Sequence, residues 1–107
     1  MGMNPRTFDR WVKALESGKY PKGKSFLLNR QGGYCCLGVL ERVCGVPADS
    51  PVLYQGYAKG DEEESALPHR GLSSRVQIKL GDINDASESF APVIAYLKRN
   101  RARLVAK

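Results

Sequence analysis

The sequence has little of what several classes of protein need. It has three cysteines, Cys35, Cys36 and Cys44, and an odd number with two adjacent members is a poor disulfide framework. It has one histidine, and no apolar run approaches the roughly 18 residues that span a bilayer. The first residues carry no apolar stretch behind a basic one. We therefore expect no signal peptide, no membrane attachment and a location in the cytoplasm where the chain is made.

Metal binding and nucleophilic catalysis are also poorly supported. The sequence has no C-x-x-C pair, and adjacent cysteines on a helix point about 100° apart. A catalytic pair would require His69, which follows Pro68 in a loop, to approach Cys35 or Cys36. We expect buried, reduced thiols, with no metal, no cofactor and no enzymatic activity.

The 107 residues make one domain, residues 1–107, with the composition of a globular protein. Their charge is unevenly placed. Residues 1–48 hold eight Lys and Arg against three Asp and Glu, residues 49–90 hold four against eight, and residues 91–107 hold five against none. This distribution has two interpretations. The acidic run at 61–64 neutralises part of the basic surface, or the basic residues form a separate face that meets a phosphate-bearing partner.

Two helices are predicted in the first half. Asn4 and Pro5 are a cap and a first helical residue, and Gly18 is a stop. Between them, the apolar residues share one face: Phe8, Trp11, Val12 and Leu15. A second helix is predicted from Cys36 to Cys44, ended by Gly45, with Glu41 and Arg42 opposite its apolar arc.

The remaining pattern indicates strands and a last helix. Residues 25–28 and 34–35 are predicted to form a hairpin, and residues 75–80 alternate like a half-buried strand. A short turn of helix or strand is expected within 52–57. The last helix should begin after Ser87 or Ser89, with Pro92 in its first turn, and leave the core near Arg101. The predicted fold class is α+β, a small antiparallel sheet packed by two core helices and a C-terminal helix.

Residues 18–25 match the phosphate-binding pattern G-x-x-x-x-G-K-[ST]. That loop needs a strand before it and a helix after it, whereas here a helix precedes and a strand is predicted to follow. We expect the match to be accidental. The lysines of this loop can still meet an anion by charge alone, with two hairpin residues beside them. These candidates are Lys19, Lys22, Lys24, Arg30 and Tyr34.

Two further segments each have two interpretations. Asn84 and Asp85 stand just before the predicted last helix, where they either shape a turn or orient a ligand at the positive helix end. The basic stretch 98–103 either complements a helix dipole or contacts a phosphate backbone.

Three blocks in order along the chain carry a family resemblance. They are Trp11-Val12-x-Ala14-Leu15-x-Ser17-Gly18-x-Tyr20, then Tyr34-Cys35-Cys36-Leu37-Gly38-Val39-Leu40, then Ile83-Asn84-Asp85 followed by Ser89-Phe90 and Ile94-Ala95. In these blocks the chain resembles a family of small proteins encoded by tailed phages and prophages. The resemblance implies an accessory protein in the bacterial cytoplasm, and such proteins often counter host defence.

The leading functional hypothesis is a non-enzymatic phage accessory protein. It would bind and sequester a phosphate-bearing small molecule, such as a nucleotide signal of host defence, and we expect a homo-oligomer to complete the pocket. The alternatives are an inhibitor of a host protein and a nucleic-acid binder that uses the two basic ends.

Overall fold

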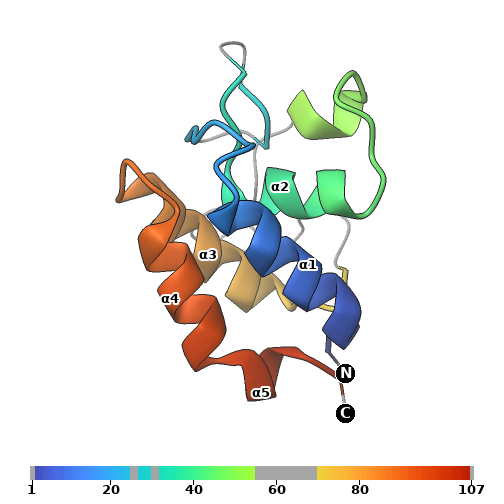
Figure 1. The fold of residues 1–107 in the computed structure, drawn as a ribbon, viewed down its shortest axis with the longest axis vertical. Coiled ribbons are helices and arrows are strands. Elements are labelled where there is room, and N and C mark those ends of the chain that lie inside the picture. The colour runs from blue at the N-terminus through green and yellow to red at the C-terminus, as the bar shows by residue number, and fades with distance from the viewer. Residues whose placement is uncertain (1, 25–26, 30–31, 55–69, 107) are drawn as a thin grey trace.

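The computed structural model describes residues 2–24, 27–29, 32–54 and 70–106, which fold into a mainly helical protein (Figure 1). The elements in chain order are α1 (Pro5–Glu16), α2 (Cys36–Val43), the 3-10 helix η1 (Pro51–Tyr54), α3 (Ser74–Asp85), α4 (Ala91–Arg99) and α5 (Arg101–Leu104).

The four longer helices enclose the core. Helix α1 packs against α2 and α4, and α3 packs against the same two helices. The ends of the chain lie side by side (Figure 1), because the amide of Met3 donates to the Leu104 carbonyl at 2.8 Å and the amide of Ala106 donates to the Met3 carbonyl at 2.7 Å.

The prediction of an α+β fold is wrong. Among the described residues there are isolated bridges but no strand, and the pairing of Leu28 with Tyr34 is a single bridge where a hairpin was expected. Residues 25–26 of that predicted hairpin lie outside the described part of the chain.

The predicted strand at 75–80 and the predicted turn after it are helix α3. The hydroxyl of Ser73 accepts a hydrogen bond from the Val76 amide at 3.2 Å and so caps the helix. The buried face of α3 consists of Gln77, Leu80, Gly81 and Asn84. Only one of these four is a large apolar side chain, so the helical period is nearly invisible in a hydrophobicity pattern.

The first two predicted helices are confirmed. The Asn4 side chain accepts from the amides of Arg6 and Thr7, and the four predicted apolar residues of α1 are buried. Helix α2 ends at Val43 with Cys44 as its C-cap, and Gly45 follows with a φ of 98°. The predicted turn near residue 52 is confirmed as η1, although residues 55–57 lie outside the described residues.

The last helix also follows the prediction in part. Pro92 lies in the first turn of α4, and the helix ends at Arg99, before a separate turn, α5, that contains Arg101. The Ser89 hydroxyl accepts from the Ala91 amide at 3.3 Å, but the capping residue is Phe90.

Helix α2 carries a buried charge that the sequence pattern did not indicate. Glu41 is 3% exposed, and its carboxylate accepts from Nε and a terminal nitrogen of Arg70, the latter at 2.9 Å. A buried carboxylate needs such a partner, since desolvating it alone costs several kcal/mol. The ion pair therefore ties α2 to the segment that leads into α3.

Gly38 lets the backbone of Leu27 lie directly against α2. A β-carbon at position 38 would stand 1.9 Å from the Leu27 carbonyl oxygen, which is far inside contact distance. That same carbonyl accepts from the Cys35 amide at 3.1 Å, so the segment has little freedom to move away.

Replacing Gly38 with Ala should destabilise the protein by about 2 kcal/mol or more, because the clash outweighs the roughly 1 kcal/mol by which Ala favours a helix. Chemical denaturation measures the change. The control is Ala95→Gly on the exposed face of α4, which should lower the free energy of unfolding by only about 1 kcal/mol. A Gly38→Ala protein more stable than the wild type would contradict the close packing described above.

Candidate functional site

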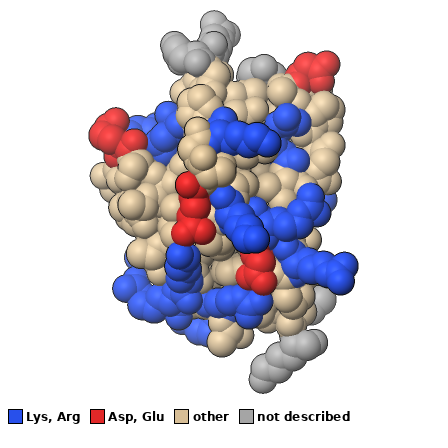
Figure 2. Space-filling model, viewed as in Figure 1, with Lys and Arg blue, Asp and Glu red and all other residues tan. Residues whose placement is uncertain are grey.

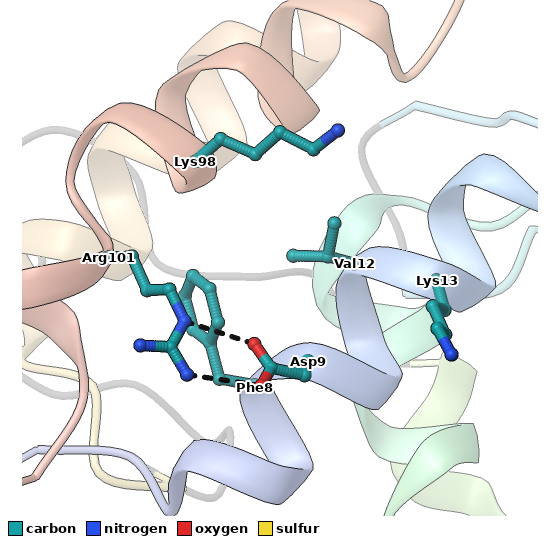
Figure 3. A pocket seen from close by; sticks show the side chains of 6 residues that line it. All are labelled: Phe8, Asp9, Val12, Lys13, Lys98 and Arg101. Carbon is teal, nitrogen blue, oxygen red and sulfur yellow. Dashed lines mark hydrogen bonds and ion pairs between the residues drawn. The ribbon is translucent and has the colours of Figure 1, made fainter.

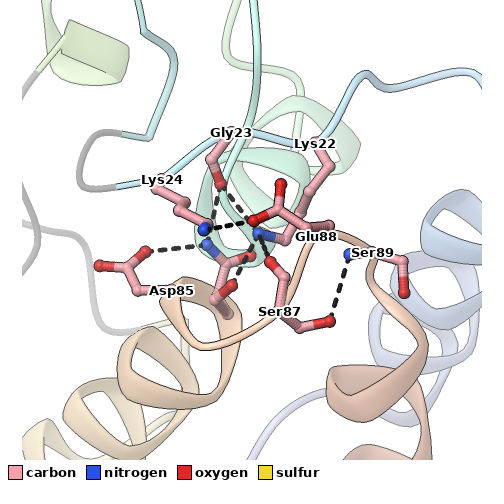
Figure 4. Close-up of polar contacts among 8 residues, drawn as sticks. Lys22, Gly23, Lys24, Asp85, Ser87, Glu88 and Ser89 are labelled. Carbon is pink, nitrogen blue, oxygen red and sulfur yellow. Dashed lines mark hydrogen bonds and ion pairs between the residues drawn. The ribbon is translucent and has the colours of Figure 1, made fainter.

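The predicted site residues separate into two places. Lys22, Lys24, Asn84 and Asp85 meet at the C-terminal end of α3 (Figure 4), whereas Lys19 lines a pocket beside α1. Arg30 lies outside the described residues.

Lys22 points toward the end of α3 (Figure 4). Its ammonium donates to the carbonyls of Asn84 at 2.6 Å, Ser87 at 2.8 Å and Gly23 at 3.2 Å. It also lies 5.9 Å from the centre of the Phe90 ring. Partial burial lowers the pKa of Lys22. Lys22 thus bonds carbonyls that have no partner within the helix and complements the negative end of the α3 dipole. Its charge therefore stabilises the fold and is not free to bind an anion.

Asn84 joins three segments of the chain. Its side chain is buried, its Oδ1 accepts from the Cys36 amide at 3.1 Å, and its Nδ2 donates to the Gly23 carbonyl at 3.0 Å and to Asp85 Oδ1 at 3.2 Å. Asn84 and Asp85 end α3, whereas the sequence interpretation placed them just before a helix. The amide of Asn84 caps the start of α2 from a distant part of the sequence.

The other two predicted residues are also engaged. Lys24 forms an ion pair with Glu88 at 2.7 Å on the surface. Tyr34 is 8% exposed, and its ring meets that of Tyr20 edge-on, with the ring centres 5.2 Å apart. Tyr34 thus supports Tyr20 from inside.

The basic pocket is a hollow of about 380 Å³ between α1, the loop that follows it and α2. None of its eight lining residues is acidic, and four are cations. The lining residues are Arg10, Lys13, Ala14, Ser17, Lys19, Tyr20, Arg42 and Val43. Figure 2 shows that Lys and Arg side chains spread over the face that carries α1, with a few acidic side chains among them.

The four cations of the basic pocket form no ion pair with a described carboxylate. A terminal nitrogen of Arg42 donates to the Val46 carbonyl at 2.8 Å, and its buried Nε has no hydrogen-bond partner among the described residues. Four like charges around one hollow, with no carboxylate in its lining, favour the entry of an anion.

Sequence reasoning found Lys19 and missed the other residues that give this pocket its chemistry: Arg10, Lys13, Tyr20 and Arg42. A signal was present, since Arg10 and Lys13 lie off the apolar face of α1 and Arg42 lies opposite the apolar arc of α2. That signal becomes a pocket only when the packing of α1 on α2 is known.

None of the three cysteines lines the basic pocket. Cys35 and Cys36 are fully buried, and desolvation raises the pKa of Cys35 to about 12 and that of Cys36 well above its usual value. Desolvation also raises the pKa of the half-buried Cys44. Within the described ranges, no three His, Cys, Asp or Glu side chains are grouped as metal ligands.

These observations define a small helical domain with a basic pocket between its first two helices. A family model for a domain of unknown function, DUF8296, matches residues 3–69, and the chain belongs to this family. Every lining residue of the basic pocket falls within the matched segment. No curated protein and no solved structure matches the chain. Across the described residues, every helix is too short or too polar to cross a membrane.

Replacing Asn84 with Ala should destabilise the protein by about 2–4 kcal/mol, because the buried amide of Cys36 loses its acceptor and the Gly23 carbonyl loses a donor. Thermal and urea unfolding measure this loss. Asn100→Ala is the matched control, since its Nδ2 makes one local bond to the Tyr96 carbonyl, and it should cost about 1 kcal/mol or less. Equal losses in the two variants would remove the special role given to Asn84.

Under native conditions at pH 8, one thiol in each chain should react with iodoacetamide. We expect this thiol to be Cys44, because Cys35 and Cys36 are buried and their raised pKa values keep them protonated. Mass spectrometry of the alkylated protein counts the modified thiols, and unfolding in urea should expose all three. Rapid native labelling of Cys35 or Cys36 would contradict their placement in the core.

Proposed function

We propose that this protein is a phage accessory protein that binds a phosphate-bearing small molecule in the basic pocket without transforming it. The ligand would be a nucleotide, such as a signal of host defence, sequestered in the cytoplasm of the bacterial host. The observation that supports this most directly is the group of four cations, Arg10, Lys13, Lys19 and Arg42, around one hollow with no acidic lining residue. The phage origin rests on the sequence resemblance.

The contrast with neighbouring charges strengthens the proposal. Four other lysines and arginines of the described residues form ion pairs, for example Lys24 with Glu88 and Arg101 with Asp9. The four cations of the basic pocket form no such ion pair with a described carboxylate, so a bound phosphate would supply a counter-charge within contact distance.

The dimensions and lining suit a nucleotide. A volume of about 380 Å³ falls within the usual range of small-molecule sites. The Tyr20 ring, supported edge-on by Tyr34, offers an aromatic surface for a base. None of the lining side chains is a carboxylate, imidazole or thiol, and the proposal is binding without a reaction. We expect a homo-oligomer, because a second copy can supply the missing walls.

A nucleic-acid strand is the second candidate ligand. The end of α4 and α5 carry four exposed basic residues, and Figure 2 shows basic side chains continuing over much of this face. They are Lys98, Arg99, Arg101 and Arg103. Two of the four are paired with carboxylates, Lys98 with Glu16 and Arg101 with Asp9, which weakens this candidate relative to the pocket.

Calorimetric titration with a panel of linear and cyclic nucleotides tests the proposal. At least one should bind with a Kd below about 100 μM, or about −5.5 kcal/mol. The double variant Lys19→Ala/Arg42→Ala should weaken that binding at least about tenfold, because each charged contact contributes about 1.5 kcal/mol or more.

Lys24→Ala is the matched control, since it removes a lysine from the same loop that does not line the pocket, and it should bind as the wild type does. If no nucleotide binds, the proposal fails, and inhibition of a host protein becomes the better hypothesis. Tight binding that survives the double variant would place the ligand elsewhere.

A further inference from the structure

A second pocket of about 430 Å³ is lined by residues of α1, α4 and α5 (Figure 3). Lys13 lines both pockets, and their α1 residues are offset by about one helical turn along the axis, roughly 5 Å, and face directions about 120° apart around it. The residues that line the second pocket are Phe8, Asp9, Val12, Lys13, Lys98 and Arg101.

The second pocket has a different chemistry. The aromatic Phe8 and the aliphatic Val12 form its apolar floor, and both are largely buried, 1% and 8% exposed. The guanidinium of Arg101 lies 5.8 Å from the centre of the Phe8 ring and donates twice to the Asp9 carboxylate, each time at 3.0 Å (Figure 3). Two parallel bonds hold this planar group in a fixed orientation.

The two pockets also differ in whether their cations are paired with carboxylates. Arg101 is neutralised by Asp9, and Lys98 forms an ion pair with Glu16 at 2.8 Å, whereas the cations of the basic pocket have no described carboxylate partner. A phosphate should therefore prefer the basic pocket. The second pocket, with its apolar surface and a fixed guanidinium plane, suits a flat group such as a nucleobase, which stacks on arginine.

We infer that the ligand is a short phosphodiester-linked oligonucleotide of two or three nucleotides, linear or cyclic, that occupies both pockets. A phosphate lies in the basic pocket, the chain passes Lys13, and the next base lies in the second pocket beside Arg101. The two pockets share Lys13 but face different directions around α1, so a chain of at least two nucleotides is needed to reach both. This inference rests on the proposed function, because it specifies the ligand of the same basic pocket.

Calorimetry with three ligands tests it: adenosine 5′-monophosphate, the linear dinucleotide with a 5′-phosphate, and cyclic di-adenosine monophosphate. At least one dinucleotide should bind the wild type at least tenfold more tightly than the mononucleotide does. Arg101→Ala and Arg101→Lys should both abolish that advantage and leave mononucleotide binding unchanged, which also shows that the variants are folded. Arg101→Lys keeps the charge and removes the planar fork.

The matched control is Arg103→Ala, which removes an exposed arginine from α5 that lines neither pocket and should keep the dinucleotide advantage. Equal affinity for mononucleotide and dinucleotides would overturn this inference and leave the proposed function standing. If none of the three ligands binds, this inference fails, and the full nucleotide panel described above decides separately whether the proposed function fails as well. A ten-nucleotide strand that binds at least tenfold more tightly than either dinucleotide, with a steep loss in salt, would identify a nucleic-acid binder and overturn the inference.

Discussion

The buried side chain of Asn84 holds together the parts of the chain from which the candidate site is built. Cys35 occupies the capping position of α2 but makes no side-chain cap, so the Cys36 amide depends on Asn84 for its acceptor. The carbonyl of Cys36 accepts from the indole nitrogen of Trp11 at 2.8 Å. The backbone of Cys36 is thus bonded to α1 and to α3. Leaving either its amide or its carbonyl without a partner would lower the stability of the fold by about 1–3 kcal/mol.

The basic pocket follows from that arrangement. Asn84 Nδ2 and the Lys22 ammonium both bond the Gly23 carbonyl, so they fix the far end of the loop that begins after α1. The near end of the loop is set by Gly18, whose φ of 76° turns the chain away from the helix. Between these points, Lys19 and Tyr20 lie against the polar faces of α1 and α2. A loop fixed at both ends presents its charges on a stable frame, as a binding site requires.

The sequence predicted the elements in which apolar residues alone mark the buried face. In α1 and α2 the helical period was visible, and both helices were found. In α3 the buried face includes Gln77, Gly81 and Asn84, so the strand-like alternation of residues 75–80 was the stronger pattern and misled the prediction. The sequence did not predict which groups the lysines contact. Lys22, for example, bonds carbonyls 62 and 65 residues away in the sequence. Such pairing depends on the packing of the helices and leaves no local trace.

The two pockets divide between parts of the chain with different relationships to the family. All residues that line the basic pocket lie within the matched segment 3–69, whereas Lys98 and Arg101 of the second pocket lie beyond it. Under the proposed function, the group shared by all nucleotides, the phosphate, would be held by the family segment through charge. With an oligonucleotide in both pockets, the base of the next nucleotide would be met by α4 and α5 through a guanidinium that Asp9 of α1 orients. Substitutions in α5 would then change the preference for an oligonucleotide over a mononucleotide, while substitutions around α2 would change whether any nucleotide binds.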